Sequence, residues 1–497
     1  MAVEHVGIDL GTTTSGLAYI RSDGNPEIVP NADGERLTPS VVYFDKHEKI
    51  KLVGSAARDG GDPNRTVHFI KRHMDDSDYF YQVDGEKWTP AEISALILAK
   101  LKRECSVIVG DVEQVVITVP ANFNELARTA TINAGSIAGL EVTRLVNEPT
   151  AAALYYAHSK GVTGNILVYD LGGGTLDITV LNVERGGTIQ ILTSEGARHL
   201  GGSNFDEIIL DLFSNAYLDA YGEHLFTDET QRLHALQSSE DAKRMLSKLK
   251  KVTETIGNDR KGIARVELTR DMFEDAVGRL LTRTVMLVEQ ALNSANLKAS
   301  EIDHVVLVGG STRIPRVKEL LKDHFGQEPV SCGNVDEVVA LGAALFAKSG
   351  NQVTEVCNQS YGTVAVIEDA ATGNEVVQNS IVIPKNTPIP CSMSQTYITS
   401  EDNEKVIEVE ITQGEDSDPR YVDVIGQIAL DVPPGRPAGC EVEVTYGYDE
   451  SQRINARVTD VETNKSKDVS ITYHGAGVLT PKQVERKSAY LKQVRIE

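Results

Sequence analysis

The chain contains few cysteines, and those that it has lie far apart. Its five cysteines are Cys105, Cys332, Cys357, Cys391 and Cys440, and no two of them have the short spacing that is typical of a zinc site. Isolated thiols of this kind suit a reducing compartment, in which disulfides seldom persist. The sequence therefore predicts neither a zinc site nor a disulfide, and it indicates a cytoplasmic protein.

Long apolar runs and an excess of positive charge are also missing. No stretch is long and apolar enough to span a membrane, and the first residues lead into an apolar strand without the pattern of a signal peptide. The 49 basic residues are outnumbered by 72 acidic residues, which gives a net charge of −23. A surface with this balance repels nucleic-acid phosphates and anionic lipids, so we expect neither a nucleic-acid nor a membrane partner.

The character of the sequence changes near residue 349. Before it, buried strands such as residues 114–119 alternate with helical stretches such as residues 90–103, which is typical of an α/β domain. After it come short strands, at residues 405–411, 440–446 and 467–473, with alternating apolar and polar side chains. Thr480 and Pro481 have the character of a helix N-cap and first helical residue. We therefore predict an α/β domain over residues 1–348, a linker over 349–359, an antiparallel β domain over 360–478 and a short helix within 479–497.

Two segments follow one design, in which an apolar strand leads to an aspartate and then to glycines and threonines. They are residues 6–13 (VGIDLGTT) and residues 168–177 (VYDLGGGTLD). Glycines let backbone N–H groups approach an anion, and threonines add hydroxyl donors. A single copy would fit an ordinary strand and hairpin better than a phosphate site. Two copies, together with the glycine pair Gly309 and Gly310, indicate a site for nucleotide phosphates.

Each copy places a carboxylate beside the expected phosphates. Asp9 and Asp170 would repel a phosphate unless a divalent cation lay between them. Mg²⁺ prefers a largely hydrated octahedral shell with few protein ligands. The pair therefore predicts that ATP binds together with Mg²⁺, and that both aspartates lie at the metal.

Two further residues are candidates for the chemistry of phosphoanhydride hydrolysis, which needs an aligned water and a positive side chain. Glu148 follows the strand expected at residues 142–146, at the strand end where α/β sheets bind ligands. It would position water, or it would merely begin a helix. Lys71 is the candidate cation, although a Lys-Arg pair also fits a solvated surface.

Six motifs then occur in an order that identifies a family. They are the two phosphate segments, residues 117–121 (ITVPA), residues 147–153 (NEPTAAA), residues 199–206 (HLGGSNFD) and residues 308–315 (VGGSTRIP). Over residues 5–347 the chain resembles the seventy-kilodalton heat-shock, or DnaK-type, chaperone family. The resemblance implies an α/β, two-lobed ATPase domain of the actin and hexokinase type, with ATP or ADP in its cleft and Mg²⁺ at the phosphates.

The resemblance also implies roles for individual residues. Asp9, Asp170 and Asp177 would act around the metal and its waters, Lys71 would orient the attacking water, and Glu148 would complete the catalytic site. The residues implied at the phosphates are Gly11, Thr12, Thr13, Gly172, Gly173, Gly174 and Thr175, with Gly201, Gly202 and Asp206 in a further loop.

Adenosine would be held from two sides. The residues implied there are Glu240, Lys243, Arg244 and Ser247 on one side, and Gly309, Gly310, Ser311, Arg313 and Asp336 on the other. The spacing of the first four places them on one face of a helix, which supports the assignment independently. An exposed charged face would have the same spacing.

The β domain resembles the peptide-binding domain of the same family. The matching segments are residues 383–390, 399–415 and 426–430. They imply a β-sandwich that binds an extended apolar segment of an unfolded client polypeptide through main-chain hydrogen bonds and a side-chain pocket. Ile407 would lie in the pocket with Ile398, Val409 and Ile411 near it, and Ser400 would belong to an arch over it. Plain core packing of these residues is the alternative.

Four features depart from the family pattern. The linker segment, residues 350–358 (GNQVTEVCN), has no leucine run, so it offers less apolar surface for docking and predicts weaker coupling between the domains. Residues 364–377 do not match, so the peptide preference is not carried over. The chain continues for only about one short helix after the β domain, which predicts no helical lid and fast peptide exchange. The stretch between Lys71 and Trp88 is shortened.

The resemblance also implies protein partners. Arg144, Asn147 and Thr150 stand where the family receives a J-domain co-chaperone, and a nucleotide-exchange factor is a second expected partner. Together these observations predict an ATP-dependent molecular chaperone that hydrolyses ATP and binds client polypeptides. The alternative is a nucleotide-switched regulatory or scaffolding protein with weakly coupled domains. A sugar kinase or an actin-like filament protein is less favoured, because the β domain has no place in either.

Overall fold

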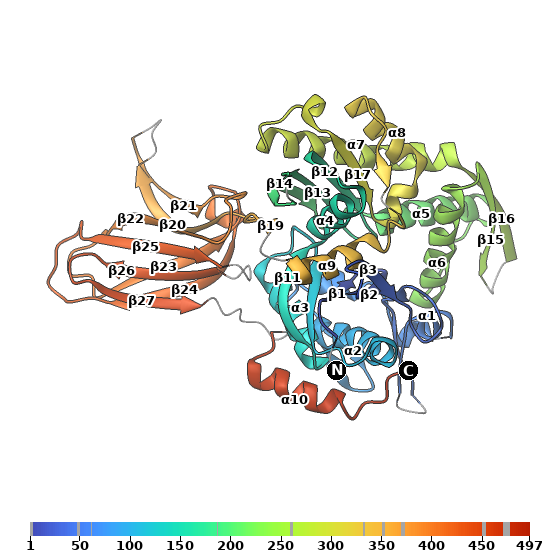
Figure 1. Ribbon diagram of the computed structural model, residues 1–497, viewed down its shortest axis with the longest axis horizontal. Helices are drawn as coiled ribbons and strands as arrows, with labels where there is room; N and C mark the ends of the chain where they lie inside the picture. Colours follow the sequence, from blue (N-terminus) through green and yellow to red (C-terminus); the bar gives the residue numbers. More distant parts are fainter. Residues whose placement is uncertain are drawn as a thin grey trace.

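The computed structural model describes residues 3–46, 50–60, 62–185, 187–258, 262–331, 333–349, 353–368, 373–449, 454–470 and 478–497. Two α/β units lie against each other, and a β-sandwich stands to one side of them (Figure 1). Helices and strands alternate up to residue 349 and strands predominate after it, as predicted. No helix in these ranges has both the length and the apolar character needed to cross a membrane.

The sheet of the first α/β unit is built around the strand that leads to the first phosphate turn. Its strands are β1 (Val6–Leu10), β2 (Thr14–Ile20), β3 (Pro26–Val29), β4 (Thr38–Pro39), β10 (Gln114–Val119) and β11 (Glu141–Asn147). β1 pairs in parallel with β10 and antiparallel with β2. Leu10 pairs with Ser15, so the turn between them emerges at the carboxyl end of β1.

The sheet of the second α/β unit repeats this arrangement. Its strands are β12 (Gly164–Leu171), β13 (Leu176–Val183), β14 (Ile189–Ala197), β17 (His304–Val308), β18 (Val330–Ser331) and β19 (Val353–Thr354). β12 pairs in parallel with β17 and antiparallel with β13. Leu171 pairs with Leu176 across the second phosphate turn. The duplication seen in the sequence is therefore also present in the strand topology.

Helices cover these sheets and join the two units. They are α1 (Ser55–Gly60), α2 (Pro90–Val109), α3 (Glu125–Ile137), α4 (Glu148–Lys160), α5 (Gly202–Tyr221), α6 (Glu229–Leu246), α7 (Arg270–Ser294), α8 (Pro315–Phe325) and α9 (Val338–Ser349). α9 packs on β1 and β2, α4 packs on β12 and β13, and the two helices pack on each other. The helical stretch predicted at residues 90–103 is confirmed as part of α2. α2 runs six residues further because the first helix breaker is Gly110, whose φ is 94°.

Shorter elements complete the two α/β units. They are β5 (Val42–Phe44), β6 (Lys51–Val53), β7 (Thr66–Val67), β8 (Tyr81–Val83), β9 (Glu86–Trp88), β15 (Lys251–Asn258), β16 (Gly262–Thr269) and the 3₁₀ turn η2 (Ile70–His73). The turn η2 carries Lys71, which is buried.

The sandwich consists of two four-stranded antiparallel sheets. Their strand orders are β21-β20-β23-β24 and β22-β25-β26-β27. The strands are β20 (Tyr361–Glu368), β21 (Glu375–Ile383), β22 (Cys391–Ile398), β23 (Val406–Gln413), β24 (Asp423–Asp431), β25 (Glu441–Tyr448), β26 (Ile454–Asp460) and β27 (Lys465–Ser470). Inward-facing side chains such as Ile428, Tyr446 and Val458 form one apolar core. The strand predicted at residues 467–473 overlaps β27, and residues 471–473 lie outside the described part.

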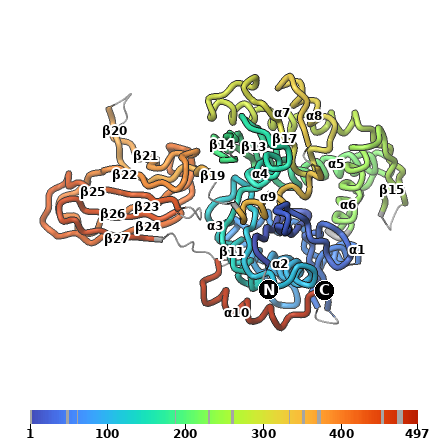
Figure 2. The backbone as a smooth tube through the Cα atoms, in the orientation of Figure 1, coloured from blue at the N-terminus to red at the C-terminus, as the bar shows by residue number. Residues whose placement is uncertain are grey.

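The segment after the sandwich returns to the first α/β unit. α10 (Pro481–Leu491) begins at the predicted N-cap Thr480, and it lies along α2 and α3 rather than over the sandwich (Figures 1 and 2). Leu491 and Ile496 are buried in the core of the first unit, and Lys487 Nζ lies 2.5 Å from Oε1 of the buried Glu92. Beyond the helix, the backbone of Glu497 pairs with Lys51 and Val53 of β6.

Candidate functional site

The predicted catalytic residues meet where the two sheets face each other. Lys71 and Glu148 form a buried ion pair between η2 and the first residue of α4. Asp9 accepts a hydrogen bond of 2.8 Å from the Thr118 hydroxyl at the end of β10. Asp170 and Asp177 face each other across the second hairpin. The strand ends thus gather four carboxylates and one cation that are far apart in the sequence.

Burial raises the pKa of all three aspartates. The pKa of Asp9 rises to about 7 and that of Asp177 to about 8, mainly because burial disfavours the charged form and secondly because Glu148 is close. The pKa of Asp170 rises well above its usual value for the same two reasons. Lys71 opposes all three shifts without cancelling them. Without a cation the aspartates therefore tend to stay protonated, and a bound cation would favour their charged forms.

The chemistry of this cluster fits a hydrated divalent cation. Both carboxylate oxygens of Asp177 are buried, and no side chain among the described residues donates a hydrogen bond to them, although the Asn122 backbone N–H is close. In that same part of the chain, no group of three or more His, Cys, Asp or Glu side chains forms a complete metal-binding cluster. A cation held here would keep most of its water shell, as Mg²⁺ does in phosphate sites.

The glycine-rich turns pack against one another in front of these carboxylates. The backbone N–H groups of Gly202 and Ser203 donate to the carbonyls of Gly172 and Gly173, over 3.0 and 2.8 Å. Ser311 Oγ donates to the same Gly172 carbonyl over 2.9 Å. Gly309 has a φ of 80°, and a Cβ there would lie 2.4 Å from the Leu171 carbonyl oxygen. The three loops can pack this closely only because they carry glycine.

The predicted adenosine residues, with the exception of Gly309, line a cavity of about 440 Å³. Among its lining are Thr13, Gly173, Asp206, Glu240, Lys243, Arg244, Ser247, Gly310, Ser311, Arg313 and Asp336. Arg244 forms an ion pair with Glu240, and Arg313 forms one with Asp336, over 2.6 and 2.7 Å. The structure thus brings residues from both α/β units to one cavity, which has the volume of a small-ligand pocket.

Lys243 is buried and joins the adenosine helix to the third loop. Its Nζ donates to the Gly202 carbonyl and to Asp206, over 3.0 and 2.8 Å. The pKa of Asp206 rises to about 6, because the effect of burial is larger than the opposing effect of the charge and hydrogen bond of Lys243. These contacts of Lys243 therefore hold α6 against the loop at residues 201–206.

The chain is similar to known chaperones over almost its whole length. The family model described as "Hsp70 protein" matches residues 5–82 and 75–495. The chain is 37% identical to "Chaperone protein DnaK" of Thermotoga neapolitana and also to that of Thermotoga petrophila. Each alignment covers 97% of this chain and 82% of the relative. The chain belongs to the Hsp70 family.

This Hsp70 is an ATP-dependent molecular chaperone and an ATPase. The alternative prediction, a regulatory or scaffolding protein, finds no support in these relatives.

A second cavity of about 440 Å³ adjoins the first and is lined by Thr12, Thr13, Arg72 and Ser203, among others. Sequence reasoning had not selected Arg72 or Ser203, although each directly follows a selected residue or motif glycine. Arg72 Nη1 donates to Ser203 Oγ over 3.0 Å and so links the two units.

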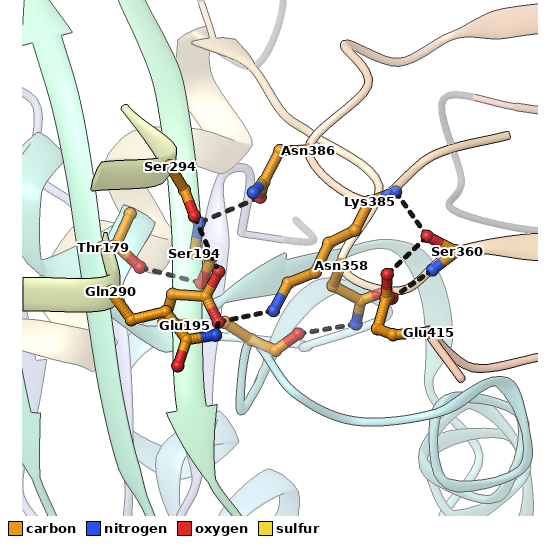
Figure 3. Close-up of polar contacts among 11 residues, drawn as sticks. Thr179, Ser194, Glu195, Gln290, Ser294, Asn358, Ser360, Lys385, Asn386 and Glu415 are labelled. Carbon is orange, nitrogen blue, oxygen red and sulfur yellow. Dashed lines mark hydrogen bonds and ion pairs between the residues drawn. The ribbon is translucent and has the colours of Figure 1, made fainter. Parts of the chain in front are cut away.

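The sandwich of this Hsp70 meets the second α/β unit through polar contacts. Lys385 Nζ lies 2.7 Å from Glu195 Oε2, and Asn386 Oδ1 accepts a hydrogen bond of 3.2 Å from the Ser194 backbone N–H (Figure 3). On the sandwich side, the Ser360 backbone N–H donates to Glu415 over 2.7 Å. Glu195 is buried and also accepts from Gln290, so this contact is anchored within the ATPase part.

The linker is docked even though it lacks leucines. β19 pairs in parallel with β14, and Val356 and Cys357 are buried. The buried Glu355 accepts a hydrogen bond of 2.9 Å from Asn147 Nδ2, which lies next to Glu148. The expectation that less apolar surface would disfavour docking overlooked these strand and side-chain hydrogen bonds. Gly350, Asn351 and Gln352 lie outside the described residues.

The residues predicted to bind peptide do not form one surface. Ile407, Val409 and Ile411 are buried in the sandwich core, which is the packing alternative left open by the sequence. Ile398 is 68% exposed at the end of β22, and Ser400 is exposed in the turn after it. The structure therefore separates a buried set on β23 from an exposed set after β22.

The J-domain positions are only partly accessible. Asn147 and Thr150 are 3% and 1% exposed, while Arg144 is half-buried. In this arrangement the docked linker and the packing of α4 enclose Asn147 and Thr150, so Arg144 is the one of the three that a co-chaperone could reach. The sequence could not indicate this, since Glu355 lies some two hundred residues further along the chain.

Proposed function

We propose that residues 1–348 hydrolyse Mg²⁺-bound ATP between the two α/β units, in a two-lobed fold of the actin and hexokinase type. The observation that carries this proposal is the convergence of two phosphate turns on the Lys71–Glu148 ion pair and three buried aspartates. Asp9 and Asp170 would hold the metal, which would neutralise charge on the β- and γ-phosphates.

The protein's own groups would then act on water and on phosphate. Lys71 would orient the attacking water and stabilise charge that develops in the transition state, and Glu148 would fix Lys71. Asp177 and Thr175 would hold water at the γ-phosphate. The predicted loops, including Gly11, Thr12, Gly174 and Gly201, would donate backbone N–H groups to the phosphates, and the α6 residues with Arg313 and Asp336 would bind adenosine.

Residues 360–478 would bind an extended apolar segment of a client polypeptide. Ile398 and Ser400 would contact it directly, because both are exposed, whereas Ile407, Val409 and Ile411 would support the surface from the core. Residues 349–359 would act as the linker that reports client binding to the ATPase part. Unpaired cysteines, including Cys105 and Cys357, support a cytoplasmic location, with a J-domain protein and an exchange factor as partners.

The deciding experiment is the steady-state ATP hydrolysis rate with and without saturating unfolded polypeptide. We expect stimulation, because the docked linker and the Lys385–Glu195 contact join the sandwich to the ATPase part. Lys71→Ala is the control and should lower kcat by about 10²-fold or more while ATP still binds. If unfolded polypeptide does not change the ATP hydrolysis rate of the parent protein, the proposed coupling is contradicted. If Lys71→Ala hydrolyses ATP at the parent rate, the proposed catalytic site is contradicted.

A further inference from the structure

One side chain of the linker is hydrogen-bonded to a loop of the first α/β unit. Asn358 is 7% exposed, and its Nδ2 donates to the carbonyl oxygens of Ala121 and Phe123, over 2.6 and 2.8 Å. These two carbonyls flank a single residue, Asn122. One linker amide therefore fixes the backbone on both sides of Asn122.

This loop, residues 121–123, lies against Asp177. A Cβ built on Gly196 would be 2.9 Å from Asp177 Oδ1 and 3.2 Å from Asn122 Nδ2, so both side chains face the same small space. The backbone N–H of Asn122 is close enough to stabilise the Asp177 carboxylate, whereas no side chain of the described residues donates to it and the Asn122 side chain has no hydrogen-bond partner there. A shift of Asn122 would therefore change the surroundings of the Asp177 carboxylate on this side.

The ATPase part also holds this loop, through hydrogen bonds that are longer than those of Asn358. Arg128 donates to the Phe123 and Ala121 carbonyls over 3.2 and 3.4 Å, and Arg198 Nε donates to the Asn122 carbonyl over 3.1 Å. Beside the loop is a polar cavity of about 220 Å³, lined by Asn122, Asn358, Lys385 and Glu415 among others. Loss of the short Asn358 hydrogen bonds would leave the loop next to open space into which it can shift.

We propose that Asn358 is a positioning residue for ATP hydrolysis, which holds the loop at residues 121–123 against Asp177 only while the linker is docked. The proposal rests on the role proposed above for Asp177 at the γ-phosphate. It gives this linker a polar means of acting on the catalytic site that does not require a leucine run. Asn358 itself does not touch the nucleotide cavity.

Two variants remove the donor in different ways. Asn358→Asp keeps the size of the side chain but cannot donate to carbonyls, and Asn358→Ala removes the amide altogether. We expect kcat for ATP to fall about tenfold in both, because two buried hydrogen bonds to the loop are lost. KM for ATP should stay within twofold, since the residues that line the adenosine cavity are untouched. Amide hydrogen exchange at residues 121–124 should become faster in both variants.

Lys385→Gln is the matched control from the same domain boundary. It breaks the ion pair with Glu195 but leaves the loop at residues 121–123 alone, so we expect kcat within twofold of the parent. Equal loss of kcat in Lys385→Gln and the Asn358 variants would overturn the proposal, because general loosening of the domains would then suffice. Parent-like kcat in both Asn358 variants would also overturn it.

Lys71→Ala separates this inference from the proposed catalytic site. If that variant loses activity while both Asn358 variants keep it, only the role of Asn358 fails. If Lys71→Ala keeps the parent rate, the proposed site fails, whatever the linker variants do.

Discussion

The side chains around Lys71 carry charges that are costly to bury separately. Lys71 neutralises Glu148, which leaves Asp9, Asp170 and Asp177 without a matching cation. Burying an unpaired carboxylate costs several kcal/mol, so without a cation the groups retain protons instead. The residues are therefore arranged for a positively charged ligand and not for the stability of the empty protein.

A single methyl group tests the close packing of the phosphate loops. In Gly309→Ala, the new Cβ would overlap the Leu171 carbonyl at 2.4 Å and the Asp170 carboxylate at 2.7 Å. We expect nucleotide affinity to fall at least about tenfold, because the loop must shift away from the phosphates. Isothermal titration with ADP and Mg²⁺ measures this.

Gly85→Ala is the control for Gly309→Ala. Gly85 has the same φ of 80°, but a Cβ there meets nothing within 4 Å. It should cost about 1 kcal/mol of stability from the backbone strain alone and leave nucleotide affinity unchanged. Equal losses of affinity in the two variants would show that the overlap at Gly309 is unimportant.

At the scale of elements, α10 is a part of the first α/β unit that is supplied from the far end of the chain. Leu491 is buried in the core that α2 and β1 also build, and the Tyr490 ring lies 6.2 Å from that of Trp88. We expect Leu491→Ala to lower the free energy of unfolding by about 2–5 kcal/mol, as is usual for a buried leucine. Urea unfolding followed by Trp88 fluorescence measures the change.

Leu218→Ala provides the comparison within the same protein. Leu218 lies on α5 and is 40% exposed, so its removal should cost less than about 1 kcal/mol. If Leu491→Ala were as mild as Leu218→Ala, α10 would not be a stable part of the first unit.

Local elements could be predicted from sequence where short-range patterns decide them. β10 has the predicted bounds because residues 115–119 are all buried, and α10 starts directly after Thr480 because the Thr480 side chain caps the helix. The docking of α10 and of the residues after it could not be predicted, because their partners Glu92 and Lys51 lie about four hundred residues earlier. The docking of the linker could not be predicted for the same reason, since Glu355 and Asn358 form hydrogen bonds with residues 147, 121 and 123.

At the scale of the whole molecule, the raised pKa values predict how stability depends on pH. Asp177 and Asp9 lose their protons near pH 8 and 7 in the folded protein but near 4 when unfolded. Between these values the folded state binds more protons, so the free energy of unfolding falls as the pH rises. We expect the melting temperature of the ligand-free protein to decrease from pH 5 to pH 8.

Addition of ADP and Mg²⁺ should counteract that decrease. Cation binding needs the charged carboxylates, so the rise in melting temperature on ligand addition should be larger at pH 8 than at pH 6. Calorimetry at both pH values tests this, with Asp177→Asn as the variant that should flatten the dependence. A ligand effect that is equal at both pH values would contradict the role of the buried aspartates.

The return of the chain to β6 has a consequence for folding during synthesis. Leu491, Ile496 and the backbone of Glu497 complete the core and the small sheet that residues near the amino end begin. Because a ribosome releases residues in order, the first α/β unit stays incomplete until the sandwich has already been made. The earliest part of the chain to emerge is thus among the last to reach its final structure, and in the meantime it exposes the apolar surface that α10 later covers.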